Sequence, residues 1–213
     1  ISQTQTGVAG AWVTPIKIDE TNTDILYTGY DRIWKSTDDG ANWSDIGGMK
    51  LTAGTELLRY IDVAKSNNQV VYTTDYTELW RSDNGGTTWT GVAEPDNSIR
   101  WIEIDPTNHL HVWLAADLDV YESTDGGVSW TDISSNLPSV AMNTIVFDDG
   151  PQDHLYVGTD FGIYYLESGT TNWVLLSQTL PNAAILELDI LESSKKIRAA
   201  TFGRGVWEKL TVN

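Results

Sequence analysis

Acidic and aromatic side chains recur in five short polar stretches, each of which separates two runs of β-forming residues. Aromatic rings stack on the apolar faces of sugars and carboxylates accept hydrogen bonds from hydroxyl groups, so this mixture is typical of a carbohydrate-binding surface. A glycosidase would need two carboxyl groups roughly 5 to 9.5 Å apart, and the sequence singles out no such pair. The candidate ligand-binding residues in these stretches are Tyr30, Asp31, Asp75, Tyr76, Asp117, Asp160, Phe161, Phe202 and Arg204.

A second group of acids belongs to a box motif that the chain writes three times, as STDDGANW, SDNGGTTW and STDGGVSW. Repeated acids could build an active site, but the residue types favour a turn. A short carboxylate or amide accepts backbone N–H groups two residues on, Gly allows positive φ, Ser adds a local bond, and Trp fills the gap between units. We therefore predict a structural role for Ser36, Asp38, Gly40, Trp43, Ser82, Asn84, Gly86, Trp89, Ser123, Asp125, Gly127, Trp130 and, in the degenerate copy LESGTTNW, Trp173.

The box motif marks the repeat that must position these side chains. Its tryptophans follow one another at intervals of 46, 41 and 43 residues. Each repeat holds an apolar run that ends in an acid, a hairpin of alternating β-formers such as DILYTGYDRIWKS, and a short strand that begins at the tryptophan. Four antiparallel strands in about 40 to 45 residues are the blade of a β-propeller, and no segment shows a sustained helical period.

The sequence therefore predicts an all-β fold, with one propeller domain over residues 1–213. Its blades are expected at about 9–47, 57–92, 98–133, 140–176 and 184–213. The last unit supplies three strands, so residues 1–8 could add its outer strand and close a five-bladed ring, because closure removes open sheet edges. Alternatively, these blades form the C-terminal part of a larger propeller.

Two sets of loops should meet at one face of such a propeller. The loop between strands two and three of a blade lies beside the connection into the next blade, and both surround the mouth of the central channel. Arg59 and Arg100 are 41 residues apart, as are the second and third boxes, so both should stand near the start of an innermost strand. They could line the channel and hold a sugar carboxylate as a sialidase does, or each could pair with an acid of a neighbouring strand.

The pattern S-x-D-x-G-x-x-W resembles the Asp-box, or BNR repeat, of a family of β-propellers, over nearly the whole chain. The final stretch ATFGRGVWEKL resembles the closing blade of extracellular bacterial propellers, both sortilin/xyloglucanase-like domains and type IX secretion cargo proteins. The resemblance implies that the box turns lie between strands three and four, on the face away from the ligand site. Xyloglucanase-like enzymes hold two catalytic acids between two propellers, whereas this chain has blades for at most one ring, which argues against hydrolysis.

No cofactor is expected. The spacing of the three histidines favours surface positions over a metal site. Asp148, Asp149 and Asp153 in FDDGPQDH could hold calcium, although this stretch lacks the spaced ligands of a dedicated calcium loop. The chain has no cysteine, which excludes disulfides, zinc-thiolate sites and thiol nucleophiles.

The composition limits the classes of partner that the protein can bind. Thirty acids against 13 Lys and Arg give a net charge of −17, so the surface repels nucleic acid, and no stretch is apolar enough to insert into a membrane. We expect a secreted or cell-surface module that binds carbohydrate or protein, within a larger extracellular polypeptide. Two other functions stay open: a fragment of a glycoside hydrolase, xyloglucanase-like or sialidase-like, and a structural spacer of a large adhesin or secreted protein.

Overall fold

The computed structural model describes residues 1, 3–48, 51, 56–96, 98–150, 152–176 and 183–212, which form five antiparallel sheets in succession. Blade 1 contains β1 (Ile16–Ile18), β2 (Leu26–Gly29), β3 (Ile33–Ser36) and β4 (Ser44–Asp45), and blade 2 contains β5 (Tyr60–Val63), β6 (Val71–Thr74), β7 (Leu79–Ser82) and β8 (Thr90–Val92). Blade 3 contains β9 (Trp101–Ile104), β10 (Val112–Ala115), β11 (Val120–Ser123) and β12 (Thr131–Asp132). Blade 4 contains β13 (Met142–Asp148), β14 (His154–Thr159), β15 (Gly162–Glu167) and β16 (Val174–Leu175), and blade 5 contains β17 (Ile185–Leu191), the 3-10 turn η1 (Glu192–Ser194), β18 (Lys196–Thr201) and β19 (Gly205–Leu210).

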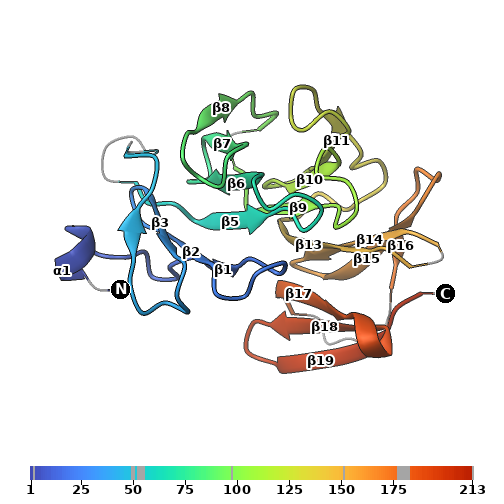
Figure 1. Cartoon of the computed structure of the whole chain (residues 1–213). Coiled ribbons are helices and arrows are strands. Elements are labelled where there is room, and N and C mark those ends of the chain that lie inside the picture. Colours follow the sequence, from blue (N-terminus) through green and yellow to red (C-terminus); the bar gives the residue numbers. More distant parts are fainter. Residues whose placement is uncertain are drawn as a thin grey trace.

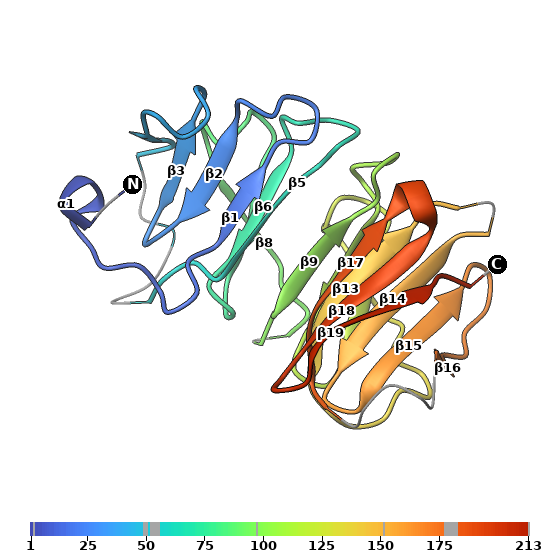
Figure 2. The ribbon, with the colours of Figure 1, turned by 90° about the horizontal axis from the view of Figure 1, so that it is seen from below.

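The blades are arranged as a β-propeller, so the predicted fold class is confirmed. Figure 1 shows the first strand of each blade, β1, β5, β9, β13 and β17, at the centre, with the remaining strands outward. Seen from below in Figure 2, blade 1 lies against blade 2 and blade 5 lies against blade 4.

The amino terminus does not complete blade 5. Residues Gln3–Thr6 form the short helix α1, which Figure 1 shows beside blade 1, and the sheet of blade 5 ends at β19. The expectation that residues 1–8 supply an outer strand is therefore wrong for the described residues, while Ser2 lies outside them. The stretch consists of Gln and Thr without the alternating apolar residues that would pack on a blade.

Equivalent strands keep one register from blade to blade. Ile16, Ile61, Ile102 and Ile145 hold the same position on the inner strands of blades 1 to 4, opposite the second strand. Because side chains alternate between the two faces of a strand, one face of each blade meets the preceding blade and the other meets the following blade. The repeat in the sequence is thus a repeat of contacts between neighbours.

The hydrophobic core is divided among the junctions between blades. Four clusters of buried side chains join blade 1 to 2, 2 to 3, 3 to 4 and 4 to 5, and each draws on both of its blades. Trp89 and Trp173 belong to the clusters with the preceding blade, and Trp130 packs against such a cluster. Among the described residues, no such cluster joins blade 5 to blade 1.

The box motifs form turns between strands three and four. In the first, Ser36 Oγ accepts the N–H of Gly40 at 2.9 Å and donates to Oδ1 of Asp38 at 2.8 Å. Asp38 accepts the N–H of Asn42, four residues on rather than the expected two, at 2.8 Å. In the second box, Asn84 replaces the acid with the same geometry, since its Oδ1 accepts the N–H of Thr88 at 2.8 Å.

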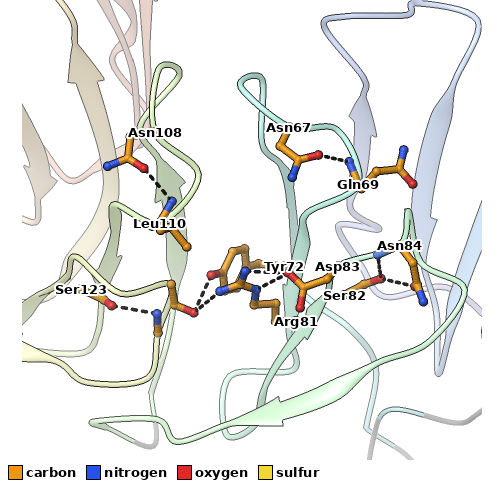
Figure 3. A network of polar contacts seen from close by, with 12 residues as sticks. Asn67, Gln69, Tyr72, Arg81, Ser82, Asp83, Asn84, Asn108, Leu110 and Ser123 are labelled. Carbon is orange, nitrogen blue, oxygen red and sulfur yellow. Dashed lines mark hydrogen bonds and ion pairs between the residues drawn. The ribbon is translucent and has the colours of Figure 1, made fainter.

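Two of these turns also receive side chains from the preceding blade. Tyr72 and Arg81 of blade 2 donate to the carbonyl oxygen of Gly126, in the box of blade 3, at 2.8 and 2.6 Å. Tyr27 and Lys35 of blade 1 approach the equivalent carbonyl of Gly85 at 3.5 and 3.2 Å. Figure 3 shows Tyr72 and Arg81 pointing toward the turn that begins at Ser123. We call this arrangement of a tyrosine, a cation and a box carbonyl the junction clasp.

Candidate binding site in the central channel

A cavity of about 1100 Å³ lies between the inner strands of the five blades. Its wall is built by β1, β5, β9, β13 and β17, together with the residues from Trp12 to Pro15 that precede β1. All five blades contribute residues to this wall, and concave sites at the centre of a propeller are typical ligand-binding positions.

A lysine and two acids stand at matching positions on three neighbouring inner strands. Lys17 Nζ lies 2.7 Å from Oδ1 of Asp62. On the next strand, Oε1 of Glu103 accepts the N–H of Phe147, in blade 4, at 3.0 Å. These side chains form a polar layer in the channel, which we call the channel layer: Lys17, Asp62 and Glu103.

The channel layer shifts the pKa values of its members. Burial, followed by the negative charge of Asp62, raises the pKa of Glu103 to about 8, although Lys17 opposes this shift. Burial also raises the pKa of Asp62 against the attraction of Lys17, while the charge of Asp62 raises the pKa of Lys17. Glu103 is therefore largely protonated at neutral pH beside the paired Lys17 and Asp62, and a carboxyl group kept protonated by burial can donate a hydrogen bond or a proton.

Arg100 is held by a polar chain at the rim of the cavity. Its Nη2 donates to Oδ1 of Asp117 at 2.6 Å, and its Nη1 donates to Oδ1 of Asn143 at 3.2 Å. Asn143 in turn donates to Oδ1 of Asp160 at 3.0 Å. For Arg100, the predicted pairing with an acid is what the structure contains.

Arg59, the matching residue of blade 2, makes no ion pair with any described residue. Its guanidinium carbon lies 5.4 Å from the centre of the Tyr76 ring, and its buried Nε has no hydrogen-bond partner in the part of the chain that the structure describes. Tyr76 occupies the loop position at which blade 3 has Asp117, and Asp75 binds its own turn through Oδ1. Tyr76 has φ +87°, which is unfavourable for a residue with a Cβ, and its side chain is 42% exposed.

Two further aromatic residues line the cavity next to the arginines. The rings of Tyr60 and Trp101 have their centres 4.3 Å apart with a tilt of 41°. Trp101 Nε1 is buried without a partner among the described residues. Apolar ring faces beside unpaired donors are suited to a ligand that is partly apolar and partly hydrogen-bonding, as sugars and peptides are.

The structure separates the predicted site residues into three groups. Arg59, Tyr76 and Arg100 line the cavity, and Asp117 and Asp160 join its rim through the polar chain. The side chains of Tyr30, Asp31 and Asp75 are buried in their turns, and Oδ1 of Asp31 accepts a bond from Nε of Arg32. The third group, exposed and outside the cavity wall, comprises Phe161, Phe202 and Arg204.

Sequence reasoning missed the channel layer and the pair Tyr60 and Trp101. A signal for the layer exists, because Lys17, Asp62 and Glu103 each interrupt an apolar inner strand at the same register of the repeat. Alignment of the repeats would have shown charged residues where a buried strand should alternate.

The histidines and the acidic stretch of blade 4 do not gather into a metal site. Within the described ranges, no three His, Cys, Asp or Glu side chains lie together as potential metal ligands. His111 instead contacts Asp105 and Glu122, and Asp148 Oδ1 accepts a bond from Nζ of Lys195 at 3.0 Å. Calcium binding by Asp148, Asp149 and Asp153 stays an untested prediction. None of the described helices has the length and apolar character to cross a bilayer.

Comparisons with known proteins support the fold. No family model and no curated protein matches the sequence. Similar solved structures include the GH74 xyloglucanase from Xanthomonas campestris, with a TM-score of 0.73 and 16% identity over 93% of this chain and 36% of that one. The extracellular domain of a hybrid two-component system from B. thetaiotaomicron gives a TM-score of 0.70 and 16% identity over 91% of this chain and 26% of that one. YCF48 from Cyanidioschyzon merolae gives a TM-score of 0.66 and 12% identity over 94% of this chain and 68% of that one.

The chain spans between 28% and 38% of the length of the GH74 enzymes that it matches. Because their identities to this chain are 21% or lower, these likenesses carry the architecture and not the activity. The architecture that they share with this chain is the β-propeller.

Proposed function

We propose that this chain is a secreted or cell-surface binding module that recognises a carbohydrate or protein ligand at the mouth of its central channel. The observation that supports this most directly is the convergence of Arg59, Tyr76, Tyr60 and Trp101 on one cavity of about 1100 Å³. Such a cavity, with ring faces and a few unpaired polar atoms, has the composition of a ligand site.

The energetics of this region favour a binding role over a structural one. A buried guanidinium nitrogen and a buried indole N–H without acceptors cost free energy in the unliganded protein. Tyr76 adds backbone strain of about 1 to 3 kcal/mol. A ligand that supplies acceptors and covers the Tyr76 ring would recover part of this cost, because strained residues and unpaired groups cluster where ligands bind.

The family and location follow from the same proposal. We assign the repeats to the Asp-box type, with the box residues as scaffold, and place the chain outside the cell, within a larger polypeptide. The similarity to the extracellular domain of a hybrid two-component system supports that location, and the structure of YCF48 bound to the D1 peptide gives an example of a peptide ligand on a similar propeller. The net charge of −17 supports the exclusion of nucleic acid.

The test is a binding screen on glycan and peptide arrays with matched variants. Tyr76→Ala and Arg59→Ala remove side chains that line the cavity, whereas Phe161→Ala removes an exposed aromatic ring outside it. We expect the first two substitutions to abolish binding and the third to leave it unchanged. Equal loss in all three would place the ligand elsewhere, and the absence of any binding by the folded protein would favour the structural spacer.

A second function, glycoside hydrolysis, is favoured by one observation. Glu103, whose pKa burial raises to about 8, has the protonation state of a general acid at neutral pH, and Asp62, paired with Lys17, is the second acid of the channel layer. The test is release of reducing sugar from polysaccharides, with Glu103→Gln and Asp62→Asn as variants. Activity that both substitutions remove would establish the enzyme, whereas release that persists in both would exclude these acids.

A further inference from the structure

Blade 1 leaves uncovered the face that the following blades bury. Ile16 is 64% exposed, whereas Ile61, Ile102 and Ile145, at the same register of blades 2 to 4, are 3%, 0% and 0% exposed. Ile18 is exposed on the same side. These isoleucines lie on the side that meets the preceding blade at every internal junction. The leading face of blade 1 comprises Ile16, Ile18, Trp34, Asp39 and Trp43.

Trp43 lacks the hydrogen bond to a preceding blade that Trp130 and Trp173 make, while Trp89 is buried at its junction with no partner for Nε1 among the described residues. Trp130 Nε1 donates to the carbonyl of Ala93 in blade 2 at 2.9 Å, and Trp173 Nε1 donates to that of Ile133 in blade 3 at 2.8 Å. Trp43 Nε1 instead donates at 2.9 Å to Gly40, within its own turn. The leading face therefore has the form of an internal junction with one partner missing.

The junction clasps show what that partner would carry. The boxes of blades 2 and 3 keep the full set of Ser, Asp or Asn, and Gly. Each accepts hydrogen bonds from a tyrosine and a cation of the preceding blade. Blade 4 has the degenerate box, and blade 3 accordingly presents Trp113 and Glu122 in place of the tyrosine and the cation. At the junctions between blades 1 and 2, 2 and 3, and 3 and 4, the two halves of the clasp are thus present together or absent together.

Blade 1 carries the receiving half of a clasp. Its box has all three turn bonds, and Asp39 stands where Gly85 and Gly126 offer their carbonyl oxygens. Asp39 adopts φ +55°, close to the +64° and +73° of those glycines, so its backbone has the same conformation. Unlike those glycines, Asp39 carries a Cβ, which at Gly126 would collide with Nη1 of Arg81, so the end of an approaching arginine must shift from the carbonyl toward the carboxylate. That carboxylate adds a negative charge at the point where the cation of a preceding blade would approach.

We propose that the leading face of blade 1 is the docking surface for one further four-stranded β-blade of the same repeat, which presents a tyrosine from its second strand and a lysine or arginine from its third strand to Asp39. In every clasp the donor blade precedes the acceptor blade along the chain. The proposal accordingly assigns the docking blade to the same polypeptide, ahead of blade 1 in ring order.

Blade 5 does not fit this role, either in the same molecule or from a second copy. At the positions of the tyrosine and the cation it has Arg198 and Glu208, which pair with each other at 3.0 Å. Glu208 would face the Asp39 carbonyl and carboxylate, and like charges at such a contact repel. An acid at the cation position makes blade 5 a poor donor to Asp39.

The experiment extends the full chain with a copy of its own blade 2. Residues 56–96 are joined ahead of blade 1 through the connection that links blades 2 and 3, in place of residues 1–11. We expect the backbone amides of β1 and β2 to exchange hydrogen at least about 10-fold more slowly than in the original chain, because a closed junction must open before these amides can exchange. Binding of a hydrophobic dye should fall, because Ile16 and Ile18 become buried.

Two matched controls test the chemistry of the clasp. One carries Tyr72→Phe and Arg81→Ala in the added copy alone, and the other adds a copy of blade 5, residues 183–212. Both should protect β1 less than the intact blade 2 copy. Equal protection by all three would overturn the clasp, and no protection by the intact copy, whether folded or not, would overturn the docking surface.

Self-association of the original chain provides an independent check. The double variant Ile16→Asn/Ile18→Asn changes only exposed side chains of the leading face. We expect the original chain and this variant to be monomers by light scattering, with equal melting temperatures. A dimer that the double substitution dissociates would show that a second copy covers the face and would contradict the proposal.

Discussion

The junction between blades 2 and 3 and the junction between blades 3 and 4 both pack one blade on the next, but different interactions hold them. The first is clasped by Tyr72 and Arg81 at the box of blade 3. At the second, Trp113 stacks on Phe147 with ring centres 4.6 Å apart. The backbone of Trp173 exchanges two hydrogen bonds with the side chain of Asn136. A second cavity, of about 670 Å³, lies beside His111 and Glu122 at this junction.

This difference shows that a box motif supplies one side of a contact, whose other side is a pair of side chains from the preceding blade. In blade 3 the residue before the box glycine is Gly126, and the cation of the neighbouring blade lies so close to it that a Cβ there would collide with Nη1 of Arg81. Where the box is lost in blade 4, nothing lies within 4 Å of the Cβ position at Gly169. Stacked rings and the bonds of Asn136 then hold the junction.

The largest expected effect is at the tryptophans. Trp173→Ala should lower the free energy of unfolding by about 3 to 5 kcal/mol, because it empties a buried site and removes the bond to Ile133. Trp130→Ala should cost less, since Trp130 is only partly buried. Urea unfolding of both variants measures the difference, and a larger loss at Trp130 would show that the clasped junction depends more on its tryptophan.

Glycine substitutions distinguish the junctions next. Both Gly126 and Gly169 have positive φ, so alanine at either should cost about 1 to 2 kcal/mol from backbone strain. Gly126→Ala should cost about 1 kcal/mol more, because it also displaces Arg81 from the carbonyl. Thermal melting of the two variants is the measurement. Equal losses would mean that Arg81 contributes nothing to the junction.

Removal of one hydroxyl group should have a smaller effect. Tyr72→Phe should lower stability by about 1 kcal/mol, since its buried hydroxyl group donates at 2.8 Å to Gly126. Tyr27→Phe, where the distance is 3.5 Å, is the control and should cost less. Chemical denaturation would compare the two, and a greater loss at Tyr27 would contradict the assignment of the clasp.

The smallest expected effect is on pH dependence at the unclasped junction. Burial alone would lower the pKa of His111, but bonds and charges from Glu122 and Asp105 outweigh it and raise the pKa above its usual value. Stability from this raised pKa is complete below about pH 6.5 and is lost as the pH rises through the folded-state pKa. Unfolding measured at pH 6 and 8 should show a loss below about 1 kcal/mol that His111→Gln abolishes. A slope that survives the substitution would assign it to another group.

Much of the fold could be predicted because the repeat is visible in the residues themselves. The box spacing and the hairpins fix five blades and the order of their strands. The prediction of an outer strand from residues 1–8 was wrong because it rested on the expectation that the ring closes. The polar residues Gln3–Thr6 have no apolar side chains that could pack on blade 5, and they form a helix instead.

The site could be predicted only in part. Arg59 and Arg100 were found from matching register, but their different partners could not be, since these depend on whether Tyr76 or Asp117 follows in the adjacent loop. The placement of loop aromatics was also invisible to pattern reasoning: Tyr76 lines the cavity, whereas Phe161 is exposed and outside its wall. Side-chain direction within a turn is set by φ and by local bonds, which composition does not encode.

The placement of every hydrophobic cluster between two blades, rather than inside one, has a consequence for how the molecule can be divided. An internal blade cut out of this chain would lose both of its cores at once and could not fold alone. The unit that gene duplication copies and the unit that folds are therefore different: the first is one blade, and the second is at least a neighbouring pair.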